Sequence, residues 1–216
     1  MARRISVIFV LAVIASSFSS GSAFSRNRPQ QDLSTLSPIL EGSPTLAPFQ
    51  HVRFCRRYPA DCKSDSTGIE RIELNTENSE LLKRINHDVN AAIAPTVKGY
   101  GADLADGWSV APVAGDCNDY AVTKRHELLQ SGLPTKALRL SVVKTASGIG
   151  HLVLVVATTK GDIVLDNLTE ALRPWQNTDY RWLKIQSAVD ARFWYEVKAP
   201  GSAVSQLDRQ FRLARR

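Results

Sequence analysis

Residues 151–158 form a continuous apolar run (His-Leu-Val-Leu-Val-Val-Ala-Thr) with the length and composition of a buried β-strand. Residues 159–161 (Thr-Lys-Gly) are typical of a turn, and residues 162–166 then return as a hairpin partner. Further strands are expected over 135–144, 180–187 and 193–199, where apolar and aromatic side chains recur. This pattern predicts an antiparallel sheet in the second half of the chain.

Two helices are expected before the sheet. Residues 79–93 are amphipathic, with Ser79 as the expected N-cap and Pro95 ending the helix. Residues 117–130 form the second helix, which follows Asp116 as N-cap. Residues 96–115, which include four glycines, are expected to be a loop. We therefore predict an α+β fold in which helices pack on one antiparallel β-sheet, and 216 residues suffice for one domain of this kind.

The first 23 residues have the layout of a secretory signal peptide, with two arginines, a short apolar run and small residues before a cleavage site after Ala23. The apolar run is too short to span a bilayer, and an uncleaved N-terminal anchor is the alternative interpretation. Residues 24–50 are expected to be a flexible arm, 51–200 the globular domain and 201–216 a basic tail. We therefore expect a soluble protein that is periplasmic or secreted.

The net charge of +6 is concentrated at the two ends of the chain. Without residues 1–23 and 208–216, the chain carries 21 basic and 20 acidic residues. Such a balanced body has no basic stripe for a nucleic-acid backbone, so nucleic acid is not an expected partner.

The three cysteines divide into a close pair and a single residue. Cys55 and Cys62 flank a short loop that contains Pro59, and in an oxidising compartment this spacing predicts a disulfide. A zinc site is the weaker alternative, because a second pair of ligands with matching spacing is missing. Cys117 is left without a partner, which makes it either a buried spectator or a reactive residue.

Cys117 lies at the expected N-terminus of a helix, where backbone amides and the helix dipole favour a thiolate. The same amides could stabilise the oxyanion of a tetrahedral intermediate. A general base is also needed, and His151 at the start of the buried strand is the best candidate by elimination. His126 lies nine residues along the same helix, about 13 Å of axial rise away, and cannot reach the thiol.

Asp166 completes this constellation if the hairpin has a particular register. When Val156 pairs with Ile163, Asp166 lies diagonally across from His151 on the same face of the sheet. The predicted arrangement has Cys117 as nucleophile, His151 as general base and then acid, and Asp166 as the group that orients the imidazole. The alternative is structural, since a lone cysteine is often a small core residue and an aspartate at a strand end is often a cap.

Three blocks of the sequence resemble the bacterial transglutaminase-like cysteine peptidases: residues 115–121 (GDCNDYA), 148–154 (GIGHLVL) and 161–167 (GDIVLDN). The resemblance covers roughly residues 50–190. It implies a papain/transglutaminase-like fold and places Cys117, His151 and Asp166 on the catalytic triad of the family. Well-understood relatives are periplasmic proteases that clip biofilm adhesins, often at a di-alanine site.

The same resemblance implies cofactors and partners. These relatives bind calcium near the catalytic cysteine, and Asp116, Asn118 and Asp119 match that segment, although Asn118 replaces a frequent Glu. Calcium is therefore a candidate ligand but not a required cofactor. The alternative is that Asp116 is only the N-cap and Asp119 a solvated acid of the first turn. The relatives are sequestered by an inner-membrane cyclic-dinucleotide receptor, which makes such a receptor a candidate partner. Trp108 matches a tryptophan upstream of the cysteine and, with Asp116, is a candidate for substrate binding or for the oxyanion site.

The sequence thus predicts an exported cysteine peptidase that forms a thioester acyl-enzyme on a cell-envelope protein. Two alternatives remain open. The same triad can transfer the acyl group to an amine, as a transglutaminase does, or the fold can serve as a non-catalytic periplasmic binding module.

Overall fold

The computed structural model describes residues 37–64, 68–96 and 107–198. The expected signal peptide over 1–23 and the basic tail over 201–216 lie outside these residues. Among the described helices, none is long and apolar enough to cross a membrane.

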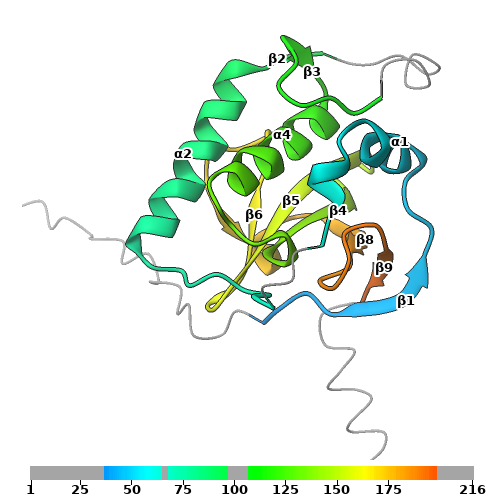
Figure 1. Cartoon of the computed structure of the whole chain (residues 1–216), viewed down its shortest axis with the longest axis vertical. Coiled ribbons are helices and arrows are strands. Elements are labelled where there is room, and N and C mark those ends of the chain that lie inside the picture. The colour runs from blue at the N-terminus through cyan, green and yellow to red at the C-terminus, as the bar shows by residue number, and fades with distance from the viewer. Residues whose placement is uncertain (1–36, 65–67, 97–106, 199–216) are drawn as a thin grey trace, which may run out of the picture. The chain divides into compact units, whose positions relative to one another are not determined.

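The centre of the described fold is a seven-stranded sheet in which every paired neighbour is antiparallel. Its order is β1-β9-β8-β4-β5-β6-β7 (Figure 1). The bounds of the strands are β1 Glu41–Thr45, β4 Leu138–Lys144, β5 Gly150–Thr158, β6 Gly161–Leu165, β7 Arg173–Pro174, β8 Arg181–Gln186 and β9 Trp194–Val197. A small parallel pair joins β2 Ala94–Pro95 to β3 Ala114–Gly115.

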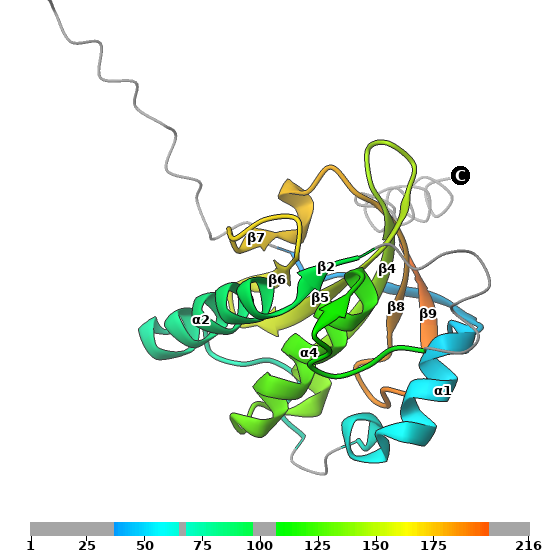
Figure 2. The same ribbon diagram turned by 90° about the horizontal axis from the view of Figure 1, so that it is seen from above.

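Three helices of the described chain are α1 Phe49–Arg57, α2 Thr76–Ala92 and α4 Cys117–Gln130. Helix α4 lies between α1 and α2 (Figure 2) and contacts β4 and β5. The predicted class, helices on an antiparallel sheet, is confirmed. Short 3-10 helices cover Pro59–Cys62, Thr135–Ala137 and Trp175–Asn177.

Strand β5 separates two apolar clusters because its side chains alternate between the faces of the sheet. Leu152, Leu154 and Val156 face the cluster that also contains residues of α2 and α4, such as Leu82 and Leu128. Val153 and Val155 belong to a second cluster together with residues of β4, β6 and β8. A strand covered on both faces explains why residues 152–157 are apolar without interruption.

Two local features differ from the sequence expectation. The helix expected over 79–93 begins three residues earlier, because Asn75 caps it by accepting a hydrogen bond from the Asn78 N–H at 2.8 Å. Part of the arm expected over 24–50 belongs to the fold, because residues 41–45 form β1 against β9 and α1 starts at Phe49. The folded part therefore begins before residue 51.

We predict that Leu154→Ala lowers the free energy of unfolding by about 2–5 kcal/mol, because the side chain is fully buried and leaves a cavity. Leu46→Ala is the matched control, since Leu46 is 85% exposed, and it should change stability by less than about 0.5 kcal/mol. Urea unfolding of the two variants measures the difference. Equal losses would contradict the assignment of the core.

Candidate active site

Cys117 is the first residue of α4 and the free cysteine of the chain. A capping box fixes this helix start: Asp116 Oδ1 accepts from the Asn118 N–H at 3.0 Å, and Asp119 Oδ2 accepts from the Asp116 N–H at 3.0 Å. Gly115 is required here, because a Cβ at that position would fall 2.7 Å from the Asp119 side chain. The sequence Gly-Asp-Cys-Asn-Asp thereby holds a half-buried thiol at the positive end of a helix.

His151 and Asp166 are brought together by the β5–β6 hairpin. Val156 pairs with Ile163, as the sequence analysis assumed, and His151 Nε2 lies 2.8 Å from Asp166 Oδ1. Both side chains are buried. His151 also forms a hydrogen bond with the Cys117 side chain. Because Nε2 faces the Asp166 carboxylate, Nδ1 is the ring nitrogen that is available to the thiol.

The protonated form of His151 is favoured. Burial alone would lower its pKa, but the hydrogen bonds to Asp166 and Cys117 and the attraction of both groups raise the pKa to about 9. Burial would likewise raise the pKa of Asp166, but the hydrogen bond and the charge of His151 hold it below the usual value. At neutral pH the pair is therefore an imidazolium against a carboxylate.

Tyr180 is a member of the site that sequence reasoning missed. Its hydroxyl donates to Asp166 Oδ2, and its ring lies edge-on to His151 with ring centroids 5.7 Å apart. Burial and this hydrogen bond raise the pKa of Tyr180, so the hydroxyl stays a donor. The only sequence signal was its place at the start of an expected strand, which says nothing about the partner.

The backbone around Asp166 is also fixed by side chains of α2. Asn86 Oδ1 accepts from the Asp166 N–H at 3.1 Å, and Asn90 Nδ2 donates to the Asp166 carbonyl at 3.1 Å. The Leu168 N–H donates to Asp166 Oδ1 at 3.0 Å. Asp166 is thus held by both its main chain and its carboxylate, which fixes where His151 can point.

Lys124 adds a buried cation near this carboxylate. It is 1% exposed, and its Nζ has no hydrogen-bond partner among the described residues. Burial lowers the pKa of Lys124 to about 7, while the charges of Asp166 and Glu170 act in the opposite direction. Near neutral pH the amino group is therefore close to the midpoint of its titration.

A cavity of about 390 Å³ opens beside the thiol, and both Cys117 and His151 line it. Trp108, which is buried and packs against His51 and Phe54, lines the same cavity. The structure therefore brings Trp108 to the thiol, whereas the Asp116 side chain serves as the helix cap.

The residues proposed for calcium form part of the helix cap. Asp119 is fully buried, with Oδ1 accepting from the Ser109 N–H at 2.9 Å and Oδ2 from the Asp116 N–H. Each carboxylate oxygen can accept more than one donor or a cation, so the oxygen-only set of Asp116, Asn118 and Asp119 fits the ligand chemistry of calcium.

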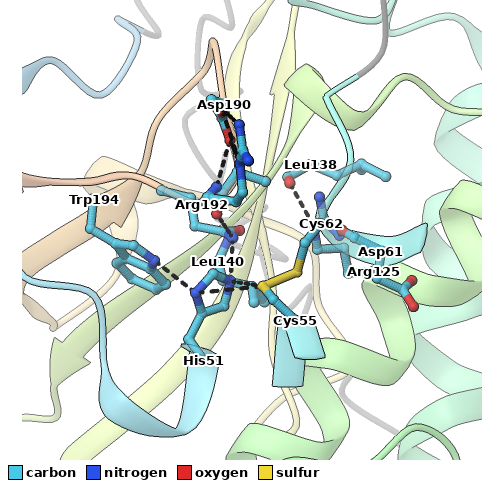
Figure 3. Close-up of a disulfide and its surroundings, with 12 residues drawn as sticks. His51, Cys55, Asp61, Cys62, Arg125, Leu138, Leu140, Asp190, Arg192 and Trp194 are labelled. Carbon is cyan, nitrogen blue, oxygen red and sulfur yellow. Dashed lines mark hydrogen bonds and ion pairs between the residues drawn. A yellow bond between two sulfur atoms is a disulfide. The ribbon is translucent and has the colours of Figure 1, made fainter. Parts of the chain in front are cut away.

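A second cluster of ligand-type side chains surrounds the disulfide that joins Cys55 to Cys62 (Figure 3). Among the described residues, His51, Cys55 and Cys62 form a group whose potential metal-ligand atoms all lie within 4.8 Å of one another. The two sulfur atoms are bonded to each other, however, so they are not thiolate ligands. The disulfide predicted from the spacing is present.

A helix-start thiol facing a histidine–aspartate pair on an α+β fold is the arrangement of papain-like cysteine peptidases. The chain belongs to the family described as bacterial transglutaminase-like cysteine proteinases, whose sequence model matches residues 41–202. It is therefore a cysteine peptidase by family, and the described residues form helices on an antiparallel sheet. The resemblance noted from the three sequence blocks is confirmed.

Among solved structures, the chain is similar to Legionella pneumophila LapG, with 21% identity over 60% of this chain and 75% of that chain and a TM-score of 0.47. A calcium-bound form of LapG matches with 18% identity over 74% of this chain and 89% of that chain, also with a TM-score of 0.47. No protein of curated function matches the chain.

We predict that two histidines titrate far from the ordinary value, His151 at about 9 and His51 at about 4. Burial and the charge of Arg125 lower the pKa of His51. Asp166→Asn should lower the pKa of His151, because it removes the charge that stabilises the imidazolium. Imidazole proton resonances followed against pH by NMR measure both values.

Asp190→Asn is the control for this titration, since Asp190 pairs with the exposed Arg192 and has no contact with His151 among its hydrogen bonds and ion pairs. The pKa of His151 should stay near 9 in that variant. A pKa of His151 at or below about 6.5 in the wild type would contradict the geometry described above.

Proposed function

We propose that this protein is an exported cysteine peptidase that cleaves a peptide bond in a protein of the cell envelope, with Cys117, His151 and Asp166 as its triad. The observation that carries the proposal is the 2.8 Å contact between His151 Nε2 and Asp166 Oδ1, which leaves Nδ1 available to the Cys117 thiol. Cys117 and His151 also line the same cavity. The family of the chain supports the same chemistry.

In the proposed reaction, the Cys117 sulfur attacks the carbonyl carbon of the scissile bond while His151 holds the thiol proton. His151 then gives this proton to the departing amine, and a thioester to Cys117 remains. Water attacks the thioester, His151 takes a proton from it, and the acid product leaves with the thiol restored. Asp166 keeps the imidazole oriented and stabilises its charge throughout.

Two groups are proposed for the oxyanion. Cys117 is the first residue of α4, so its own backbone N–H lies at the helix start beside the thiol, and the Trp108 side chain lines the cavity next to it. Asp116 supports this turn as its N-cap.

A biofilm adhesin is the proposed substrate, and an inner-membrane cyclic-dinucleotide receptor is the proposed partner. Both proposals rest on the sequence resemblance of the three blocks around the triad. The signal-peptide pattern of residues 1–23 supports a periplasmic or secreted location for this substrate.

We predict that the purified chain cleaves members of a defined peptide library and that Cys117→Ala and His151→Ala each reduce cleavage by about 10³-fold or more. Mass spectrometry of the new N-termini measures cleavage. His126→Ala is the matched control, because His126 lies on the same helix but contacts Asp61 at 2.9 Å, and it should keep activity.

Two results would change this proposal. Activity that survives Cys117→Ala would overturn the nucleophile. A labelled primary amine captured into the products, with little free acid, would instead indicate acyl transfer of the transglutaminase type, and an inert wild type would favour the binding module.

Calcium is proposed to bind at Asp116, Asn118 and Asp119, where it would stiffen the first turn of α4 under Cys117. We predict that calcium raises the melting temperature relative to EGTA, as any ligand of the folded state does. Asp116→Asn should reduce this shift while preserving the helix, because asparagine caps as well as aspartate but contributes no charge to the calcium site. An equal shift in the variant would contradict the site.

A further inference from the structure

Helix α1 has two faces of opposite exposure. His51 and Phe54 pack into the protein, and each is 2% exposed. Phe49 and Val52 are 63% and 50% exposed. Because an α-helix repeats every 3.6 residues, Arg56 lies on the same side of α1 as Phe49 and Val52, and it is exposed as well. This side of α1 therefore carries apolar side chains at its start and a basic side chain at its end.

Exposed apolar side chains are concentrated at the start of this helix. Among the described residues, ten large apolar side chains are exposed, and three of them, Leu46, Phe49 and Val52, lie within seven positions. Leu46 directly precedes α1 and is 85% exposed, so it projects from the surface rather than lining a groove. Single exposed apolar residues are common on any protein, but a group of them indicates an interaction surface.

The charge next to this apolar group has one sign. Residues 42–60 contain three arginines and no acidic residue. Arg56 and Arg57 form the exposed end of α1, and Lys63, which follows the next 3-10 helix, is exposed too. Asp61 is the next acid along the chain, but it is 4% exposed and its carboxylate contacts a histidine of α4 at 2.9 Å. Its charge is thus directed away from the surface that the arginines occupy.

The buried side of α1 holds the helix in place. The disulfide between Cys55 and Cys62 joins α1 to the following 3-10 helix (Figure 3). The indole N–H of Trp194 donates to His51 Nδ1 at 3.2 Å, which ties α1 to β9. Because the helix is preorganised in this way, a partner that binds its exposed side loses little free energy to ordering the protein.

The outer face of α1 comprises Leu46, Phe49, Val52, Arg56 and Arg57. We propose that this face docks the protein on a membrane surface that contains anionic phospholipids. The arginines contact lipid phosphates, and the apolar side chains enter the boundary between headgroups and acyl chains. A soluble polyanion would pair with the arginines but would leave the apolar side chains in water, which favours a lipid surface. The proposal goes beyond the peptidase function and does not depend on it.

Docking through this face also orients the active site. Pro48, Phe49 and Gln50 line the cavity beside Cys117, so the thiol lies next to the outer face of α1. A docked molecule therefore presents Cys117 close to the lipid surface, where it reaches polypeptide segments that lie near the membrane.

Sedimentation with lipid vesicles tests the proposal. The exported protein, purified after removal of the leader, is mixed with vesicles of phosphatidylcholine alone or of equal parts phosphatidylcholine and phosphatidylglycerol. Each basic side chain near an anionic surface strengthens binding about fivefold, so we expect about 10-fold or more stronger binding to the anionic vesicles at low salt. High salt should remove most of this difference, because it screens the charges.

Two double variants separate the contributions of charge and apolar surface. Arg56→Gln with Arg57→Gln should weaken binding to the anionic vesicles about 10-fold or more, because two contacts to phosphate are lost. Phe49→Ser with Val52→Ser should weaken it by about 10-fold as well, because less apolar surface leaves water on docking.

Arg84→Gln on α2 and Phe193→Ser are the matched controls. Both side chains are exposed, Phe193 at 59%, and neither belongs to the outer face of α1. Both variants should bind vesicles as the wild type does. All the changed side chains are at the surface, so the melting temperature of each variant should stay at the wild-type value.

Equal binding to the two kinds of vesicle, or unchanged binding in both double variants, would overturn the docking face. Binding that is kept in those variants but lost when the four arginines of residues 209–216 become glutamine would assign it to the tail instead. Binding to neither kind of vesicle would exclude a lipid partner and leave the face to a protein. Cys117→Ala should bind vesicles as the wild type does, so a failure of the peptidase proposal would not alter this result.

Discussion

The register of the β5–β6 hairpin is the constraint on which the rest of the site depends. Pairing of Val156 with Ile163 brings His151 and Asp166 within 2.8 Å, and a slip of one residue would turn one of the two to the opposite face. Burial of both faces of β5 enforces the pairing, because a slip would exchange the contents of the two apolar clusters. The packing of the two apolar clusters against β5 therefore also fixes the relative position of His151 and Asp166.

Buried polar groups then define the site, and each is costly unless it is satisfied. Asp166 meets this condition through His151, Tyr180 and the Leu168 N–H, and Asp119 meets it through two backbone amides. Lys124 is the exception among these groups, since its amino group has no hydrogen-bond partner in the described part of the chain. The structure therefore places a buried amino group, whose charged form is disfavoured by burial, within electrostatic reach of the carboxylate that orients His151.

Much of this arrangement could be predicted from sequence because it follows local rules. The start of α4 at Cys117, the cap at Asp116 and the disulfide all depend on residues a few positions apart. Sequence reasoning failed where the partner is distant in the chain. Strand β1 contains a glycine and a proline, which are unusual in strands, and its partner β9 lies about 150 residues further along the chain. The contact of Tyr180 with Asp166 likewise depends on where β8 begins. Such contacts are set by tertiary packing rather than by local propensity.

The pH dependence of the alkylation of Cys117 by iodoacetamide, in the wild type and in His151→Ala, tests the central claim most directly. The measurement is clean because the other two of the chain's three cysteines are joined in a disulfide. The account predicts that at pH 6 the wild type reacts on the order of tenfold or more faster than a free cysteine peptide, and that His151→Ala loses this advantage. A wild type that reacts only above pH 8, with a profile that the substitution leaves unchanged, would contradict the pairing of this thiol with His151.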